Sequence, residues 1–220
     1  MRTLGWDEVT WDEFVGALRV YKERFAGKSG EDSAYIRCLR ALEGLPSTGR
    51  AARAAEIVDF LNSWAARVSR ADTSLMLRAW IREHAHRLDR LAGLTIVGGL
   101  AVDDIQELYA SLMTAGRAHV RNWSDAANSK ALHQLVPAVF VMWDNRIKQF
   151  AVEYGDFTRE MYRFARRLIG ESPYRSDRVE LELQAAFQYS ARKPLAKYLD
   201  EFNTVRASGV YRGAPGWPVA

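Results

Sequence analysis

The sequence predicts an all-α protein, and three observations lead to this fold class. Apolar residues recur at spacings of three and four along most of the 220 residues, which is the period of an amphipathic helix. No stretch of about four to eight residues alternates apolar and polar positions, as a half-buried strand does. Glycine and proline interrupt the periodic stretches, as in Leu45–Gly49, and mark helix ends. We therefore expect a two-lobed bundle of about ten helices.

Each periodic stretch gives one expected helix. The expected helices cover residues 10–25 (with a start at Asp7 as the alternative), 33–42, 50–64, 73–91, 103–115, 124–135, 156–169, 177–190 and 193–203. Between them, Gly93–Leu100 has strand-like residues, but its glycines indicate a buried connection. We expect one all-α unit over 1–206, with lobes 1–100 and 101–206. The glycines and prolines of 207–220 leave too little apolar content to fold, which predicts a flexible tail.

The composition excludes several classes of protein. Hydrophobic residues make up 48% of the chain and charged residues 26%, as in folded globular proteins. Cys38 is the single cysteine, so an internal disulfide, a four-cysteine zinc site and a cysteine-ligated iron–sulfur cluster are excluded. His84 and His86 are two residues apart and point to different sides of a helix, so we expect no metal site.

Cofactors and membranes are not expected either. Gly93–Gly99 lacks the spacing of a phosphate-binding glycine loop, and we expect no cofactor. The first residues lead directly into acidic ones, and no stretch approaches ~18 consecutive apolar residues. We therefore expect neither a secretion signal nor a membrane span. The lone thiol fits a reducing compartment, which predicts a cytoplasmic protein.

The charge balance is mildly basic. Lys and Arg number 31 against 27 for Asp and Glu, giving a net charge of +4. This excess permits a polyanionic partner such as DNA without requiring one. Arginines also recur at Arg159, Arg163, Arg166 and Arg167. They belong either to a solvated helix face or to a surface that follows a nucleic-acid backbone.

The most informative stretch runs from Asn128 to Ile147. An expected helix carrying Lys130 ends at Pro137, five apolar residues follow at Val139–Trp143, and Asp144 comes next. Asp144 is either the N-cap of a following helix or a functional carboxylate at a partly buried edge. Lys130 is either a solvent-facing helix residue or an amine nucleophile. For Trp123 and Trp143 the alternatives are core packing and stacking on a base.

This stretch resembles the helix-hairpin-helix base-excision DNA glycosylases. The resemblance covers residues 105–147, with Ser129–Ala131 matching the lysine region of that superfamily and Trp143–Ile147 the aspartate region. Phe60–Trp64 and Leu132–Pro137 also look like an uncharacterised prokaryotic family that we associate with this fold. The turn of the expected hairpin, Val120–Ser124, has none of the glycines that bind phosphate in the glycosylases.

The resemblance implies an activity and a set of site residues. The protein would flip a damaged or modified base out of duplex DNA and cleave its N-glycosidic bond, without a metal or a cofactor. Asp144 and Lys130 would be catalytic. Trp123, Trp143 and His133 would contact the base, and Arg117, Arg121 and Arg146 would contact the DNA backbone.

Three other functions remain open from the sequence. The first is a nucleic-acid-binding helical module without catalysis, which the missing hairpin glycines favour. The second is an N-glycosidase of a free modified nucleoside. The third is protein–protein interaction through the helical surface.

Overall fold

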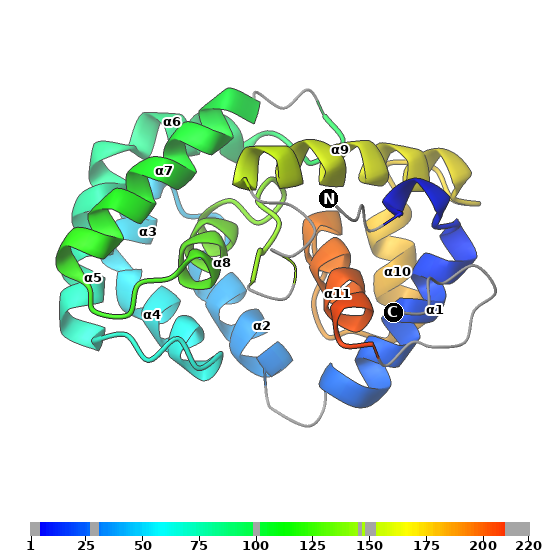
Figure 1. The fold of residues 1–220 in the computed structure, drawn as a ribbon, viewed down its shortest axis with the longest axis horizontal. Coiled ribbons are helices and arrows are strands. Elements are labelled where there is room, and N and C mark those ends of the chain that lie inside the picture. The colour runs from blue at the N-terminus through cyan, green and yellow to red at the C-terminus, as the bar shows by residue number, and fades with distance from the viewer. Residues whose placement is uncertain (1–4, 27–30, 99–101, 145–146, 148–152, 210–220) are drawn as a thin grey trace.

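The described fold is built of α-helices, and the long connection between α8 and α9 contains the apolar segment and Asp144 (Figure 1). The computed structural model describes residues 5–26, 31–98, 102–144, 147 and 153–209, apart from the side chains of 31 and 32. Eleven α-helices and no strand occur in this part of the chain, so the prediction of an all-α protein is confirmed. In chain order the helices are α1 (Trp11–Tyr21), α2 (Glu31–Leu42), α3 (Ser47–Ala52), α4 (Ala54–Ser63), α5 (Arg70–Glu83), α6 (Ala85–Ala92), α7 (Val102–His119), α8 (Asp125–Leu135), α9 (Tyr154–Glu171), α10 (Val179–Phe187) and α11 (Leu195–Ala207).

Two of the expected helices are each divided in two. The helix expected over 50–64 begins earlier and breaks at Arg53, which leaves helical geometry between α3 and α4. The helix expected over 73–91 breaks at His84, whose ring bonds the Trp80 carbonyl oxygen at 3.0 Å. Thr73 was the expected cap, but Ser69 caps α5 and Thr73 is buried within it. Periodicity cannot distinguish these two hydroxyl residues, because they lie about one turn apart.

The helices form two packed groups that meet along the middle of the molecule. Helices α3–α7 pack together on the left of Figure 1, with α2 and α8 beside them, and α1 packs against α11 on the right. Helix α9 contacts both α7 and α11 and so joins the two groups. The first and last helices of the described chain therefore share a core, across the boundary that the sequence suggests at residue 100.

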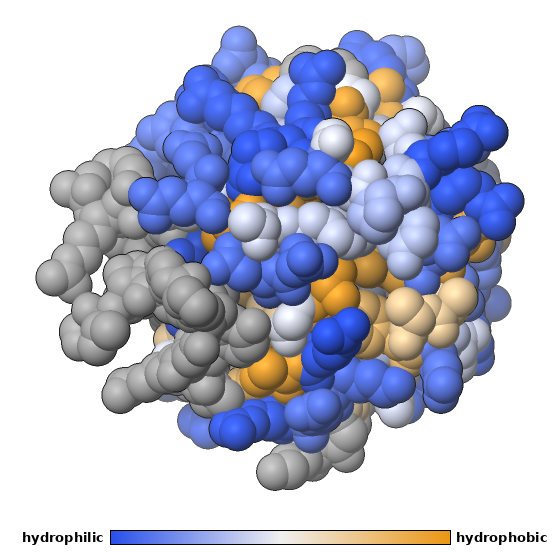
Figure 2. All heavy atoms as spheres, turned by 90° about the vertical axis from the view of Figure 1, so that its right-hand side faces the viewer, coloured by the Kyte–Doolittle hydropathy of each residue, from blue (hydrophilic) through white to orange (hydrophobic). Residues whose placement is uncertain are grey.

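The surface of the molecule is mostly hydrophilic on the side opposite α3–α7, as expected for a globular protein. On the face in Figure 2, which is the side where α1, α9 and α10 lie, hydrophilic side chains predominate and surround smaller apolar patches. None of the described helices is both long enough and apolar enough to cross a membrane. Residues 210–220, most of the expected tail, lie outside the described part of the chain.

Helix α8 is enclosed on every side. It begins after Ser124, whose hydroxyl accepts a hydrogen bond from the backbone N–H of Ala127 at 3.2 Å, and every residue from Ala127 to Leu135 is buried. It contacts α2, α4 and α7. A helix that is enclosed in this way is usually apolar on all faces. Helix α8 instead carries five buried polar residues: Asn128, Ser129, Lys130, His133 and Gln134.

Helices α7 and α8 form a hairpin whose turn is fixed by Trp123. The indole lies directly on Gly116 of α7, where an added Cβ would be 2.1 Å from the ring. The indole N–H donates to the side-chain oxygen of Asn128 at 3.0 Å, and the Asn128 amide donates to the Tyr109 carbonyl at 2.9 Å. Asn122 supplies the left-handed backbone of the turn, with φ of 67°, a conformation that asparagine tolerates well.

We predict that Gly116→Ala destabilises the protein by about 1–3 kcal/mol, because the methyl group must displace a buried indole. The free energy of unfolding in urea, followed by tryptophan fluorescence, measures this effect. Gly170→Ala in α9 is the control, because nothing lies within 4 Å of its Cβ position. That variant should gain roughly 0.5–1 kcal/mol from the lower backbone entropy of alanine. Equal stability of Gly116→Ala and the wild type would contradict the prediction.

Candidate functional site

Ser129 brings the Lys130 helix and the Asp144 segment together. Its hydroxyl accepts a hydrogen bond from the backbone N–H of Trp143 at 2.9 Å and also lies 2.9 Å from the Trp143 carbonyl oxygen. Lys130 and Asp144 are the sequence neighbours of these two residues. The hairpin and the segment after it therefore pack against each other inside the molecule.

Asp144 lies where the chain emerges from the core. Val139–Trp143 are all buried, whereas Asp144 is partly exposed. One of its carboxylate oxygens accepts a hydrogen bond from the backbone N–H of Ile147 at 3.1 Å. The alternative in which Asp144 is the N-cap of a following helix falls on residues that lie outside the described part of the chain. The next described helix, α9, begins only at Tyr154.

Lys130 is buried and its ammonium group lies against an indole. Lys130 is 8% exposed, and its Nζ is 4.2 Å from the centre of the Trp64 ring. Ammonium groups are attracted to the faces of aromatic rings, most strongly to tryptophan. In this conformation the amine points into the protein rather than into solvent. The solvent-facing alternative for Lys130 is therefore wrong.

Both tryptophans singled out in the sequence are buried. Trp143 packs among Tyr109, Tyr154 and Phe157, with ring centroids 5.6–6.1 Å apart, and Trp123 fixes the hairpin turn. These contacts are the core-packing alternative. A role for either ring in stacking on a flipped base stays a prediction, because it requires a conformation in which the ring is exposed.

His133 is completely buried and engaged through both ring nitrogens. Nε2 lies 3.1 Å from the Tyr35 hydroxyl and Nδ1 lies 2.5 Å from the Phe140 carbonyl oxygen. The pKa of His133 is lowered to about 3, mainly by burial; the hydrogen bond to Phe140 opposes this shift and the positive charge of Lys197 adds to it. The imidazole is therefore neutral near pH 7 and links α8 to α2 and to residue 140.

We predict that His133 makes stability fall as the solution is acidified. The unfolded chain protonates this ring below about pH 6.5, whereas the folded protein does not until about pH 3. Protonation of His133 therefore leaves the free energy of unfolding unchanged above about pH 6.5. As the pH falls from there toward 3, this free energy decreases by up to about 1.4 kcal/mol per pH unit. Urea unfolding of the wild type and His133→Gln at several pH values measures it. The variant should be less stable but have the shallower pH dependence. Parallel curves would contradict this assignment.

The arginines expected to contact DNA are only partly described. Arg117 lies near the end of α7 and Arg121 in the hairpin turn, and both are exposed. They bring positive charge to the tip of the α7–α8 hairpin. Arg146 lies outside the described residues.

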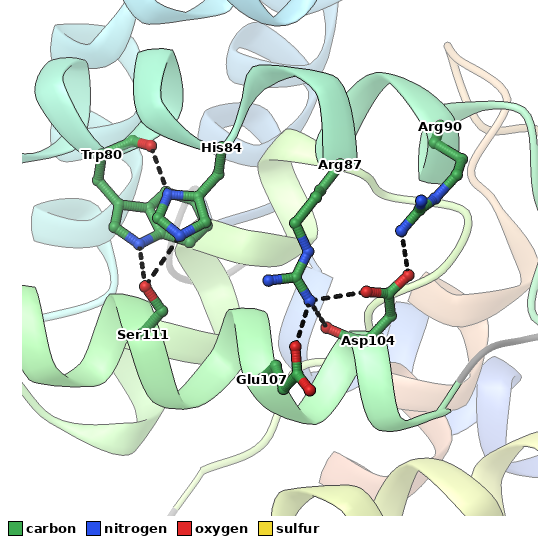
Figure 3. A network of polar contacts seen from close by, with 7 residues as sticks. All are labelled: Trp80, His84, Arg87, Arg90, Asp104, Glu107 and Ser111. Carbon is green, nitrogen blue, oxygen red and sulfur yellow. Dashed lines mark hydrogen bonds and ion pairs between the residues drawn. The ribbon is translucent and has the colours of Figure 1, made fainter.

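A polar network holds α7 against α5 and α6 (Figure 3). His84 stacks on Trp80 with ring centroids 4.5 Å apart, and the Ser111 hydroxyl of α7 bonds both rings at 3.0 Å. Farther along, Arg87 donates to Asp104 at 2.7 Å and to Glu107 at 2.9 Å. Arg90 also pairs with Asp104. This network fixes the first half of α7 and so positions the hairpin.

Sequence reasoning missed a buried cluster of four charges at the start of α11. Lys193 donates to Glu201 at 2.7 Å, and Lys197 donates to Asp200 at 2.7 Å and lies 3.8 Å from Glu201. All four side chains are at most 5% exposed. Two cations and two anions balance each other, which is how proteins accommodate buried charge.

Aromatic rings surround the two lysines of this cluster. Lys193 Nζ is 3.4 Å from the centre of the Tyr189 ring, and Lys197 Nζ is 5.2 Å from the centres of Tyr35 and Trp64. Trp64 therefore faces both Lys197 and Lys130. The signal in the sequence is the pattern of α11, where apolar residues occupy every face around these charges, so that a packed helix must bury them. We assign the cluster a structural role because solvent does not reach it.

Comparison with protein-family models, with curated proteins and with solved structures gives no match to this chain. In the described part of the chain, no group of three or more His, Cys, Asp or Glu side chains is arranged to hold a metal ion. The function must therefore be argued from the residues themselves.

Proposed function

We propose that the protein binds duplex DNA through the α7–α8 hairpin and hydrolyses the N-glycosidic bond of a damaged or modified base, with Asp144 as the catalytic carboxylate. The observation that carries this proposal is the pair of contacts between Ser129 and the backbone of Trp143. They join the lysine region to the aspartate region, which is the juxtaposition that the resemblance to the helix-hairpin-helix glycosylases implies.

The hairpin supplies the proposed DNA contacts. Its turn has no glycine to bring backbone amides close to a phosphate, but Arg117 and Arg121 are exposed beside it. Arginine forms strong charge-assisted hydrogen bonds with phosphate oxygens. Such contacts orient a protein on DNA without reading its sequence.

Partial exposure of Asp144 supports its proposed role, because the carboxylate is not sealed in the core. Cleavage of an N-glycosidic bond builds positive charge at the anomeric carbon of the sugar, and a fixed carboxylate stabilises that charge. The oxygen of a water molecule attacks this carbon as the bond to the base breaks, with the electron pair leaving on the base nitrogen. Asp144 accepts a proton from the water, and the released base takes up a proton from solvent.

Lys130 acts as a packing residue in this proposal. Its ammonium is held against Trp64, so we propose that water, rather than the lysine amine, attacks the sugar. Borohydride would then trap no covalent complex between the protein and DNA. Recovery of such a complex, and its loss in Lys130→Met, would restore the nucleophilic role that the sequence suggests.

We predict that Asp144→Asn lowers base release by about 100-fold or more. Asparagine keeps an oxygen that can accept the Ile147 N–H, so the turn is preserved while the negative charge is lost. The substrates are labelled duplexes that each contain one uracil, hypoxanthine, oxidised guanine or hydroxymethyluracil, and alkali-labile sites are scored. Asp72→Asn, at an exposed carboxylate of α5, is the matched control and should retain full activity. Release that is unchanged in Asp144→Asn would remove Asp144 from the mechanism.

We predict that Arg117→Gln and Arg121→Gln each weaken DNA binding about equally for all sequences. Each substitution should also reduce the slope of log affinity against log salt by roughly 1, because one fewer counterion is released. Fluorescence anisotropy with a labelled duplex at several salt concentrations measures both quantities. Arg175→Gln is the control, because Arg175 pairs with Asp177 in the segment between α9 and α10, on the opposite side of the molecule in Figure 1 from the α7–α8 turn. An unchanged slope in both hairpin variants would show that DNA does not contact this tip.

A second candidate is a DNA-binding module without catalysis. It is favoured by one observation, namely that Lys130 and Asp144 both have structural contacts, to Trp64 and to Ile147. This candidate predicts salt-dependent DNA binding that is equal in the wild type and Asp144→Asn, with no base released from any duplex.

A further inference from the structure

A cavity of about 360 Å³ lies at the far end of α8 from the Ser129 contacts. It is formed where the end of α2, helix α3 and the end of α8 meet residues 192–194. Its apolar wall includes Leu39, Leu42, Val136 and Pro194. This volume is in the range of small-molecule sites, which combine apolar walls with a few polar groups.

The carboxamide of Gln134 lines this cavity and has no hydrogen-bond partner. Gln134 is 1% exposed, and neither its nitrogen nor its oxygen is bonded within the described structure. Buried polar groups in native proteins nearly always have partners. His133, which directly precedes Gln134 on α8, is hydrogen-bonded through both of its ring nitrogens. An amide that lacks every partner and lines a cavity needs a ligand to complete it.

The other polar residues that line the cavity differ in whether their side chains already have hydrogen-bond partners. Arg50 donates to the Leu135 carbonyl oxygen, but its Nε–H is buried without a partner. Arg192 and Glu180 form an ion pair at 2.8 Å, and the other oxygen of Glu180 accepts the Leu195 N–H at 2.8 Å. The buried groups without partners are thus the amide nitrogen and oxygen of Gln134 and the Nε–H of Arg50, and the exposed carboxylate of Glu43 also lines the cavity.

We propose that this cavity binds a planar heterocycle that presents adjacent N–H and C=O groups, as hypoxanthine, uracil and guanine do. On binding, the Gln134 side chain turns toward the cavity, so that its oxygen accepts the ring N–H and its amide nitrogen donates to the neighbouring carbonyl oxygen. A carboxamide makes such a two-point contact with the edge of a base. The ring then packs against the leucine and proline side chains. This inference concerns a site separate from Asp144 and does not rest on the proposed glycosidase activity.

The test is calorimetric titration of the protein with hypoxanthine, inosine, uracil, uridine and guanosine. We expect saturable binding of at least one of them, and at least about tenfold weaker binding by Gln134→Met, which keeps the shape but loses both hydrogen bonds. The unliganded Gln134→Met protein should melt roughly 2–6 °C higher, because a buried amide without partners has been removed. Gln106→Met on α7, which lies beside Gly155 and outside the cavity, should bind as the wild type does.

A comparison of ligands keeps the proposal testable even where a variant fails to fold. Analogues methylated at the ring nitrogen cannot donate to Gln134 and should bind the wild type at least about tenfold more weakly. Binding of none of these compounds, or equal binding of the methylated and unmethylated forms, would overturn the proposal. Full affinity in a folded Gln134→Met variant would do the same.

Discussion

The structure depends on the enclosure of α8, a helix that carries five polar side chains into the core. Burying a polar group without a partner costs on the order of 1–3 kcal/mol, so the surroundings of α8 must supply partners at fixed places. Asn128 bonds the hairpin turn and α7, Ser129 bonds the segment that leads to Asp144, and His133 bonds Tyr35 of α2. Because hydrogen bonds require specific partners and directions, they restrict the positions of the elements around α8 more than apolar contacts would.

The same principle governs α11, where the buried polar groups are charged. Lys197 lies between two carboxylates and three aromatic rings, so removal of one partner would leave a buried charge without compensation. Trp64 connects the two buried helices because it faces Lys130 of α8 and Lys197 of α11. Farther along α11, Asn203 accepts the indole N–H of Trp6 at 3.1 Å. The two ends of the described chain are therefore tied to each other by a polar contact.

Gln134 is informative because it departs from this pattern. Its neighbours on α8 show that the fold can satisfy buried polar groups, so a carboxamide left open beside a cavity points to a bound molecule rather than to poor packing. Helix α8 thus contributes to two separate candidate sites. Near its middle, Ser129 joins the Lys130 and Asp144 regions. At its C-terminal end, Gln134 and Arg50 line the cavity that we propose for a small heterocycle.

The sequence by itself determined the fold class and the approximate position of most helices, α8 among them, because periodicity, glycine and proline act locally. It also singled out 128–147, where lysine and aspartate flank an apolar segment. Only the tertiary structure decided which polar residues are buried and what they contact. Tyr35 lies 98 residues from His133, and Trp6 lies 197 residues from Asn203. Helical spacing reports which residues share a face, but whether a second helix covers that face depends on contacts distant in the chain. For this reason the sequence alone does not distinguish Lys197 and Gln134, which are buried, from polar residues on the surface.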